Sequence, residues 1–369
     1  MISGSDIKKG FNILIEDGAH ELTNKLKNRY SNPFYSAEDK VLGYYYNKKR
    51  GTDRNQKDLI HKLIEQEEFV LVILDACRFD YFQETYKDYL DGELKKVWSE
   101  GSRTPEWIPK TWTEDYNITY VSGAPYMSDF RKDSLSGNYT PSEHFERIKH
   151  VWATDWDGKR YTTNPSAITN TALSQISSDK KTRLVIHYLQ PHQPYIGNAS
   201  DEFREKPEIP IWDASQTSYS LEEIYKLNDP QTRHTEQPDL PRYLVGEQIR
   251  DGNLTVEEWR AAYKRNLRAI FNEEIKTLVK YINPECTTVI SSDHGELLGE
   301  RSEIFNRRLN MHPSRVDPRL KEVPWFTVNK EHLEGKQIPD SKIYNQNAEK
   351  SDISSTDVEE HLADLGYLE

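Results

Sequence analysis

The sequence predicts an α/β protein with a doubly wound, mostly parallel central sheet flanked by helices, interrupted by one loop-rich insertion. Residues Phe69–Leu74 form an uninterrupted apolar run, rich in β-branched side chains, that leads directly into Asp75. Such a run is typical of a strand buried on both faces of a parallel sheet. A second short run, Thr287–Ser291, leads in the same way into Asp293 and His294. Strand-like and helix-like segments alternate between the two runs, which favours a doubly wound sheet.

The first half of the chain supplies two outer helices and then strands that alternate with helices. Residues 7–30 and 57–66 have helical patterns, and the polar, Tyr-rich stretch 44–56 reads as their connection. After the first buried run we predict a helix at 80–89, a strand at 94–98, a helix entered through the turn 101–107 and a strand at 118–122. In that turn Thr104 suits the N-cap and Pro105 the first helical position.

The second half repeats the alternation around the insertion. We predict strands at 148–153 and 183–189, a helix begun at about Pro165, a loop from 292 to Pro318, a strand at 323–328 and a short helix at 358–365. Residues 197–253 are rich in Pro, Glu, Asp and Gln, which indicates an insertion or lid. Thr255 and Glu258 form a capping-box pattern that opens the most strongly amphipathic helix.

These elements divide the chain into three parts. We expect an N-terminal helical segment over 1–67 that packs on the core, a core domain over 68–330 that contains the insertion at about 197–253, and a C-terminal tail over 331–369.

Composition excludes several classes of protein. The 369 residues carry a net charge of −12, which disfavours binding to nucleic acid because phosphate backbones are bound by clustered Lys and Arg. No window approaches the roughly 20 apolar residues of a transmembrane helix, and we see no signal peptide. We therefore expect a soluble, cytoplasmic protein. Cys77 and Cys286 fall in or beside predicted buried strands, so neither a disulfide nor a Cys-based metal site is expected. The oligomeric state is left open.

Two acids and a histidine follow the buried strands. Because the carboxyl ends of parallel strands meet at one edge of a sheet, Asp75, Asp293 and His294 should face the same crevice. Two carboxylates and one imidazole suit a divalent cation such as Mn, Zn, Mg or Ca. The simpler alternative is that Asp75 caps a helix while Asp293 and His294 shape a turn.

Three motifs carry a resemblance to a known family. They are LDACRFD (74–80), PHQPY (191–195) and SDHGELLGE (292–300). In this order they resemble the sulfatase-like branch of the alkaline phosphatase superfamily, whose members hydrolyse or transfer phosphate and sulfate esters. The resemblance implies Asp75, Asp293 and His294 as metal ligands. It also implies a nucleophile in the loop after the second strand, which would complete the site.

The chain departs from the sulfatases in two places. Asp75 is followed by Ala76, where sulfatases commonly have paired Asp, and no C/S-x-P-x-R motif occurs at Cys77 or in the loop SRTPEW. A formylglycine sulfatase is therefore not expected. A Thr or Ser nucleophile would instead resemble the phosphotransferase branches of the superfamily.

Thr104 is the preferred nucleophile and a further metal ligand. An oxygen at a helix N-terminus lies in the positive potential of backbone N–H groups, which also suits an anionic ester. Ser102 is the alternative, and Thr111 and Thr113 are more remote ones. Thr104 could equally be a plain N-cap before Pro105.

Other polar residues extend the candidate site. His192, just past a strand, would by resemblance contact a non-bridging oxygen or the leaving group, or it would simply hold a turn between two prolines. His312 is a candidate leaving-group acid or ligand of a second metal. Arg78 would neutralise the ester anion or form a salt bridge with Asp80.

Two further residues are expected to act as support. We expect Glu296 to orient His294, and His187, inside a strand, to be a satisfied core histidine.

The predicted function is that of a metal-dependent hydrolase or transferase acting on phosphate or sulfate esters through a Thr or Ser nucleophile. Small-molecule, glycan and lipid-linked esters remain open as substrates. The alternatives are a sulfate-ester hydrolase without formylglycine, a catalytically inactive metal-stabilised binding protein, and an interaction scaffold that uses residues 197–253.

Overall fold

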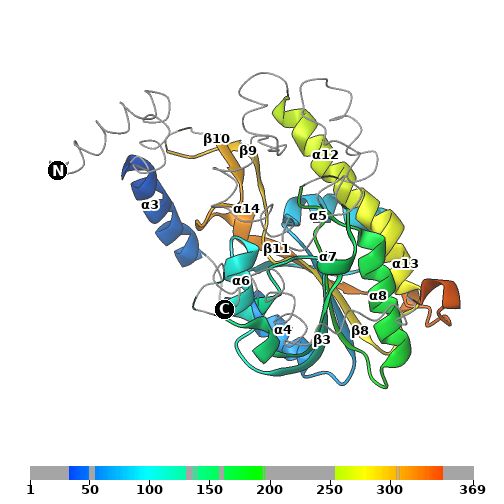
Figure 1. Cartoon of the computed structure of the whole chain (residues 1–369). Helices are drawn as coiled ribbons and strands as arrows, with labels where there is room; N and C mark the ends of the chain where they lie inside the picture. The colour runs from blue at the N-terminus through cyan, green and yellow to red at the C-terminus, as the bar shows by residue number, and fades with distance from the viewer. Residues whose placement is uncertain are drawn as a thin grey trace, which may run out of the picture.

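The computed structural model describes residues 33–49, 55–129, 135, 137, 139–157, 162–193, 195, 254–304, 306 and 308–343. Its centre is a seven-stranded sheet with the strand order β2-β11-β8-β1-β7-β3-β4 (Figure 1). The strands are β1 (Phe69–Leu74), β2 (Gly92–Trp98), β3 (Tyr116–Ser122), β4 (Phe145–His150), β7 (Arg183–Tyr188), β8 (Thr287–Ser291) and β11 (Glu322–Val328). Helices flank the sheet, so the predicted α/β fold class is confirmed.

The sheet is mixed but mostly parallel. β1 pairs in parallel with β7 and β8, and β3 pairs in parallel with β4 and β7. β11 lies between β8 and β2 and runs antiparallel to both. Because β1, β7 and β8 are adjacent and parallel, the residues after their last positions lie at one edge of the sheet.

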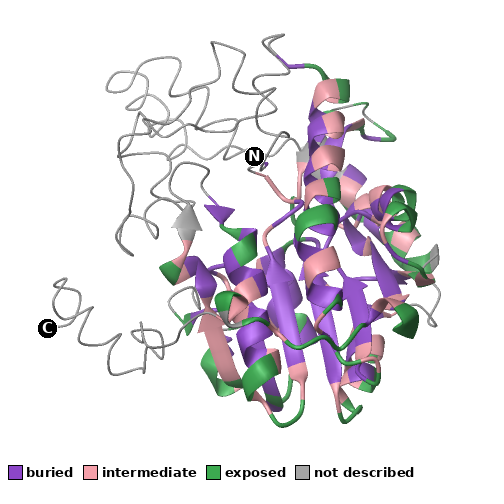
Figure 2. Ribbon diagram, turned by 90° about the vertical axis from the view of Figure 1, so that its right-hand side faces the viewer, coloured by how far each residue is buried: buried purple, intermediate pink, exposed green. Residues whose placement is uncertain are grey.

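Each face of the sheet is covered by its own set of helices. Val70, Val72 and Leu74 of β1 pack into one apolar cluster, whereas Phe69, Leu71 and Ile73 pack into the cluster on the other face, as strand alternation requires. Helices α5 (Phe79–Thr85), α8 (Pro165–Ser178), α12 (Val256–Ala269) and α13 (Lys276–Val279) lie on the first face, and α4 (Gln56–Ile64) and α6 (Thr104–Thr111) on the second (Figure 1). In Figure 2 the central strands are mostly buried, whereas the helices around them carry buried, intermediate and exposed residues.

Local capping explains where several helices begin. The capping box predicted for Thr255 and Glu258 is present: the Thr255 hydroxyl accepts the Glu258 N–H, and the Glu258 carboxylate accepts the Thr255 N–H. Asn164 caps α8 by accepting the Ser166 N–H, ahead of a proline in the first turn. α12 continues through a π-helical segment, η6 (Ile270–Ile275), into α13.

Two predicted segments are corrected by the structure. The start of the expected connection 44–56 belongs instead to helix α3 (Pro33–Lys49), which tertiary contacts hold: the Tyr46 hydroxyl donates to Glu303 at 3.0 Å. The strand expected at 148–153 begins earlier, as β4, and its last predicted residues form α7 (Val151–Thr154).

The predicted loop from 292 to Pro318 is also wrong. It contains an antiparallel hairpin of β9 (Leu297–Arg301) and β10 (Arg308–Met311), followed by α14 (Pro318–Lys321). The remaining short elements are η2 (Tyr86–Asp88), η4 (Pro141–Glu143), β5 (Trp156–Asp157), β6 (Thr162–Thr163), η7 (Lys330–His332) and η8 (Asp340–Lys342).

Several predictions fall outside the described residues: the helix at 7–30, the insertion 197–253 and the helix at 358–365. The three-part division of the chain therefore stays a prediction. Within the described ranges, no helix is both long enough and apolar enough to span a bilayer.

Candidate active site

The carboxylates that follow β1 and β8 converge at the sheet edge. Ile73 pairs with Ser291 in the ladder, so Asp75 and Asp293 emerge from neighbouring strands on the same side. His294 Nε2 lies 3.5 Å from Asp75 Oδ1 and 3.4 Å from Asp293 Oδ2. All three side chains are almost completely buried. The structure thus brings together the three residues that the sequence predicts as metal ligands.

Thr104 completes this group from the other side. Its Oγ1 donates a hydrogen bond to Asp293 Oδ2 at 2.7 Å and lies 3.3 Å from His294 Nε2. The N-cap of α6 is Arg103, and Thr104 is already helical, so the expectation that Thr104 is a plain N-cap is wrong. Its hydroxyl points into the crevice because it binds Asp293 and caps no backbone N–H.

The orientation of His294 leaves a lone pair facing the acids. Its Nδ1 lies 2.7 Å from the carbonyl oxygen of Gly295, which accepts only if Nδ1 carries the proton. Gly295 can lie there because it has no Cβ: one would come within 2.0 Å of the Arg319 carbonyl oxygen. Burial lowers the pKa of His294 well below its usual value, which favours the neutral ring. Nε2 is therefore an acceptor, like the carboxylate oxygens around it.

Converging acceptor atoms at these separations indicate a cation site. Ligand atoms at about 2.0–2.1 Å from a tetrahedral ion lie about 3.4 Å from one another, which matches the separations of His294 Nε2 from both acids. Asp75 Oδ1 is buried and accepts no hydrogen bond from the described residues. Buried polar atoms without a partner are rare and costly, so a cation would satisfy this oxygen.

His187 joins the same group, which the sequence reasoning missed. Its Nδ1 pairs with the Tyr120 hydroxyl at 2.8 Å, but its buried Nε2 has no hydrogen-bond partner among the described residues. One ligand atom each from His187, Asp75 and Asp293 lie within 4.8 Å of one another. We expected both ring nitrogens of His187 to be hydrogen-bonded in the core, but within the described part of the chain only Nδ1 is. His187 lies near the carboxyl end of β7, which is adjacent to β1, and this position could have indicated that it belongs to the site.

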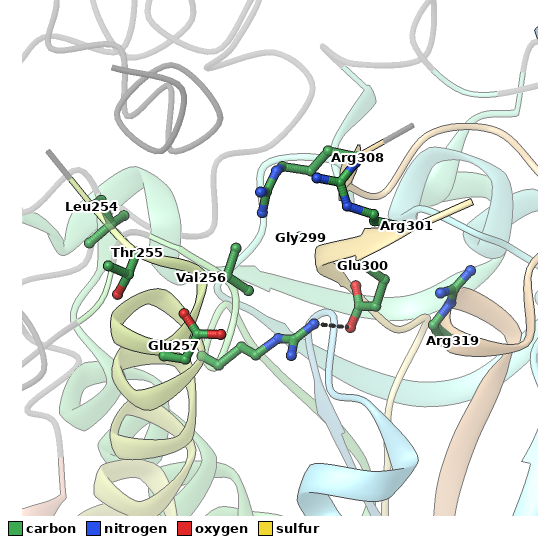
Figure 3. Close-up of a pocket in the computed structure, with 10 residues that line it drawn as sticks. Leu254, Thr255, Val256, Glu257, Gly299, Glu300, Arg301, Arg308 and Arg319 are labelled. Atoms are coloured by element: carbon green, nitrogen blue, oxygen red, sulfur yellow. Dashed lines mark ion pairs between the residues drawn. The ribbon is translucent and has the colours of Figure 1, made fainter. Parts of the chain in front are cut away.

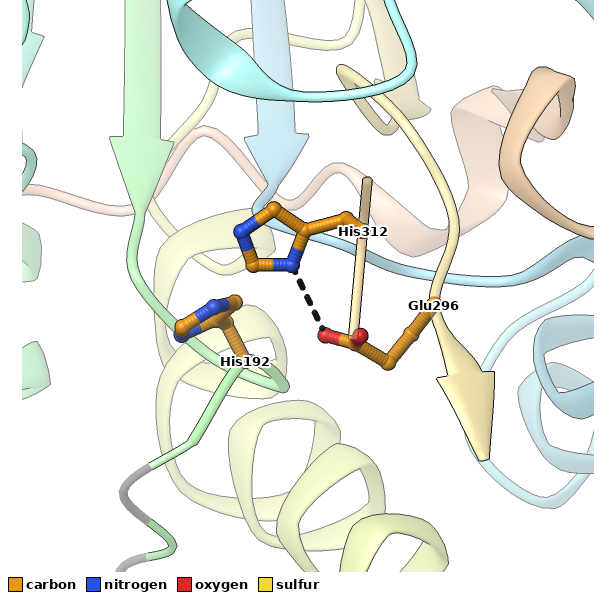
Figure 4. A group of neighbouring side chains, drawn as sticks. All are labelled: His192, Glu296 and His312. Atoms are coloured by element: carbon orange, nitrogen blue, oxygen red, sulfur yellow. Dashed lines mark hydrogen bonds and ion pairs between the residues drawn. The ribbon is translucent and has the colours of Figure 1, made fainter. Parts of the chain in front are cut away.

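A second polar cluster borders the first. His312 Nδ1 lies 3.3 Å from Glu296 Oε2, and the His312 ring centroid lies 4.9 Å from that of His192 (Figure 4). The His312 ring centroid also lies 4.8 Å from that of His294. Glu296 therefore contacts His312 instead of orienting His294, contrary to expectation. His192, Glu296 and His312 also offer ligand atoms within 4.8 Å of one another.

Charge interactions set different protonation states in the second cluster. Burial lowers the pKa of His192 to about 4, assisted by His312. Burial also acts to lower the pKa of His312, but the Glu296 carboxylate outweighs it and raises that pKa above the usual value. The pKa of Glu296 is lowered, because His312 outweighs the effect of burial. These shifts favour the protonated form of His312 and the neutral forms of His192 and His294, so His312 is the better placed of the three to donate a proton.

Two predicted site residues, Ser102 and Arg78, form their hydrogen bonds and salt bridges with other groups than the metal-ligand candidates. The Ser102 hydroxyl donates to the Pro313 carbonyl at 3.1 Å and to Glu106 at 3.3 Å, so it does not share the hydrogen bonds of Thr104. Arg78 forms salt bridges with Asp80 at 2.6 Å and Glu300 at 2.5 Å, the alternative that the sequence left open.

The buried Asp75 carboxyl predicts a pH-dependent stability of the metal-free protein. Burial, followed by repulsion from Asp293 and Glu296, raises the pKa of Asp75 well above its usual value. For an acid of raised pKa, stability is fully present below the unfolded-state value and is lost as pH rises through the folded-state value. In chelator, the melting temperature should therefore fall from about pH 4 to about pH 8 less steeply in Asp75→Asn than in the wild type. Parallel curves would contradict this assignment.

Comparisons with known proteins give distant structural similarity only. No protein-family model and no curated protein matches the sequence. The soluble domain of lipooligosaccharide phosphoethanolamine transferase A from Neisseria meningitidis is similar at 14% identity and a TM-score of 0.42, covering 73% of this chain and 79% of that one. A Bacteroides thetaiotaomicron protein described as a sulfatase gives 13% identity and a TM-score of 0.38, with coverages of 75% and 73%.

A third similar structure is the phosphonate monoester hydrolase of Agrobacterium radiobacter, at 10% identity and a TM-score of 0.40, covering 74% of this chain and 70% of that one. The three are named as a transferase, a sulfatase and a hydrolase. At these values the likeness assigns no residue a role.

Proposed function

We propose that the protein is a metal-dependent hydrolase or transferase of phosphate esters, with Thr104 as its nucleophile. One observation carries the proposal: the buried Thr104 hydroxyl lies 2.7 Å from Asp293 Oδ2 and 3.3 Å from the lone-pair nitrogen of His294, beside Asp75. An isolated structural threonine would not need two acids and an imidazole around it at a sheet edge.

Asp75, Asp293, His294 and Thr104 would hold one divalent cation. Hard carboxylate oxygens with one imidazole suit Zn, Mn, Mg or Ca, and the unsatisfied Asp75 oxygen supports the fit. When bound, the cation would lower the pKa of the Thr104 hydroxyl and offset negative charge on the ester oxygens.

Thr104, Asp293, His312 and His192 each have a separate role in the proposed reaction. The Thr104 hydroxyl gives its proton to Asp293, to which it already donates, and Oγ1 attacks phosphorus. The new P–Oγ1 bond forms as the ester P–O bond breaks, and the departing oxygen takes the proton of His312. Water or an acceptor hydroxyl then attacks the phosphothreonine and gives its proton to His312. The P–Oγ1 bond breaks as Asp293 returns its proton to Oγ1, which restores the Thr104 hydroxyl. Neutral His192 would donate a hydrogen bond to a non-bridging oxygen.

Removal of the metal is expected to abolish turnover. We expect chelator-treated protein to lose at least about 100-fold in kcat on aryl phosphates or phosphodiesters, because the nucleophile loses its activation. Titration with Zn, Mn, Mg and Ca should restore activity and identify the ion. Full activity in chelator would refute the proposal.

An aryl sulfate in the same panel separates phosphate from sulfate chemistry. Faster turnover of the sulfate ester would favour the sulfate-ester hydrolase. A large thermal shift on metal addition without turnover of any ester would favour the inactive binding protein. Turnover of glycan-linked and of lipid-linked phosphate esters would then identify the class of natural substrate. Product analysis with and without added alcohols would distinguish hydrolysis from transfer. The cytoplasmic location stays a prediction.

A further inference from the structure

A second, arginine-lined pocket lies beyond the candidate active site. It has a volume of about 730 Å³ and opens between the first turn of α12 and the β9–β10 hairpin (Figure 3). Its charged lining consists of four guanidinium groups and two carboxylates: Arg260, Arg301, Arg308, Arg319, Glu257 and Glu300. None of these residues has a part in the proposed reaction.

The positive charge of this pocket is only partly neutralised. Arg319 pairs with Asp317 at 2.7 Å, and Arg260 pairs with Glu300 at 3.4 Å. Among the described residues, no carboxylate forms an ion pair with Arg301 or Arg308. The remaining lining acid, Glu257, lies on α12, on the opposite side of the pocket from the hairpin (Figure 3).

Arg301 and Arg308 face each other across the hairpin. They are direct partners in the antiparallel ladder of β9 and β10. Like charges directly opposite on paired strands destabilise the pairing, so an anion bound between the two guanidinium groups would remove a repulsion as well as add hydrogen bonds. This cross-strand pair is therefore the best-placed anion-binding element of the pocket.

The floor of the pocket depends on a glycine. Gly299 has φ +81°, a conformation that other residues rarely adopt. A Cβ there would lie 2.9 Å from Val256 Cγ2 and 3.4 Å from Arg308 Nη1. The backbone can thus approach both α12 and the Arg308 guanidinium, which leaves the space open.

The same hairpin connects the pocket to the candidate active site. Glu296 immediately precedes β9, and His312 immediately follows β10. At about 3.3 Å per residue, Arg301 and Arg308 lie about 13–17 Å along the strands from these two residues. Glu300 also binds Arg78, close to Asp75 in the chain, at 2.5 Å.

We propose that this pocket is a subsite for a phosphate-type oxyanion carried by the substrate or the acceptor, about 13–17 Å along the hairpin strands from Glu296 and His312. Planar guanidinium groups bind such oxyanions through paired hydrogen bonds, and Arg301 and Arg308 supply two of them. The assignment of the anion to the substrate or acceptor rests on the proposed function. The binding of an oxyanion in the pocket is independent of that function.

Binding of inorganic pyrophosphate tests the pocket without requiring turnover. Calorimetric titration in chelator should give a Kd that rises about tenfold in Arg301→Gln and in Arg308→Gln, because each loses a charged hydrogen-bond donor. Arg268→Gln is the matched control, since Arg268 is a surface arginine paired with Asp88. Equal Kd values in all four proteins, or no binding in any, would overturn the proposal.

Vesicles distinguish a lipid source from a soluble one. Arg308-dependent sedimentation with phosphatidylcholine vesicles containing phosphatidic acid, but not with pure phosphatidylcholine, would assign the anion to a lipid headgroup. Arg308-dependent pyrophosphate binding without such sedimentation would assign it to a soluble ligand. Either result supports the subsite. Arg-dependent binding in a protein that turns over no ester would refute the proposed function while leaving the subsite intact.

Discussion

Replacing Thr104 by alanine is expected to lower kcat by at least about 10³-fold on any ester that the protein turns over, because the attacking oxygen is removed. The protein should remain folded, since the change deletes one hydrogen bond, worth about 1–3 kcal/mol, without opening a large cavity. Steady-state kinetics with a thermal melt on the same sample measure both effects.

Two neighbouring variants make the result specific to the Thr104 hydroxyl. Thr104→Ser keeps the oxygen and should retain most of the activity. Ser102→Ala removes a hydroxyl from the same turn, but one that binds Pro313 and Glu106, so turnover should persist. Full turnover in Thr104→Ala, or its loss in Ser102→Ala alone, would move the nucleophile away from Thr104.

The variant Asp293→Asn is expected to separate metal affinity from stability. Asp293 accepts the Thr104 hydrogen bond and faces His294 Nε2 at 3.4 Å, so its loss should weaken metal binding by more than about 100-fold and reduce kcat in parallel. In chelator the variant should be at least as stable as the wild type, because the amide removes the repulsion between two buried acids.

An exposed acid provides the control for Asp293. Asp80 binds Arg78 at the surface, with its side chain 54% exposed, and Asp80→Asn should leave metal affinity unchanged. Calorimetric titration with the activating metal measures all three proteins. Wild-type affinity in Asp293→Asn would show that this carboxylate is not a ligand.

The parts of the fold that the sequence predicts well are those with strong local signals. β1 and β8 are apolar runs that end in acids, and the Thr255 capping box marks the start of α12. The β9–β10 hairpin lacks such signals: β9 contains no β-branched residue and includes Gly299, so pairing with β10 decides its structure. β4 alternates with charged residues, FERIKH, which obscured its start.

The candidate site was likewise only partly predictable from the sequence. The position of Asp75, Asp293 and His294 after two buried strands was enough to predict that they converge, because the carboxyl ends of parallel strands lie at one edge of a sheet. The orientation of side chains could not be predicted: Ser102 and Thr104 are two residues apart, and only the turn into α6 decides which faces Asp293. Likewise, the unsatisfied nitrogen of His187 depends on packing against Tyr120.

The most direct test is anomalous diffraction from crystals of the metal-loaded protein. We predict one strong peak within bonding distance of Asp75, Asp293 and His294, with Thr104 Oγ1 beside it. A cation bound elsewhere on the chain, with these three side chains binding none at saturating metal, would contradict the proposed site and the chemistry built on it.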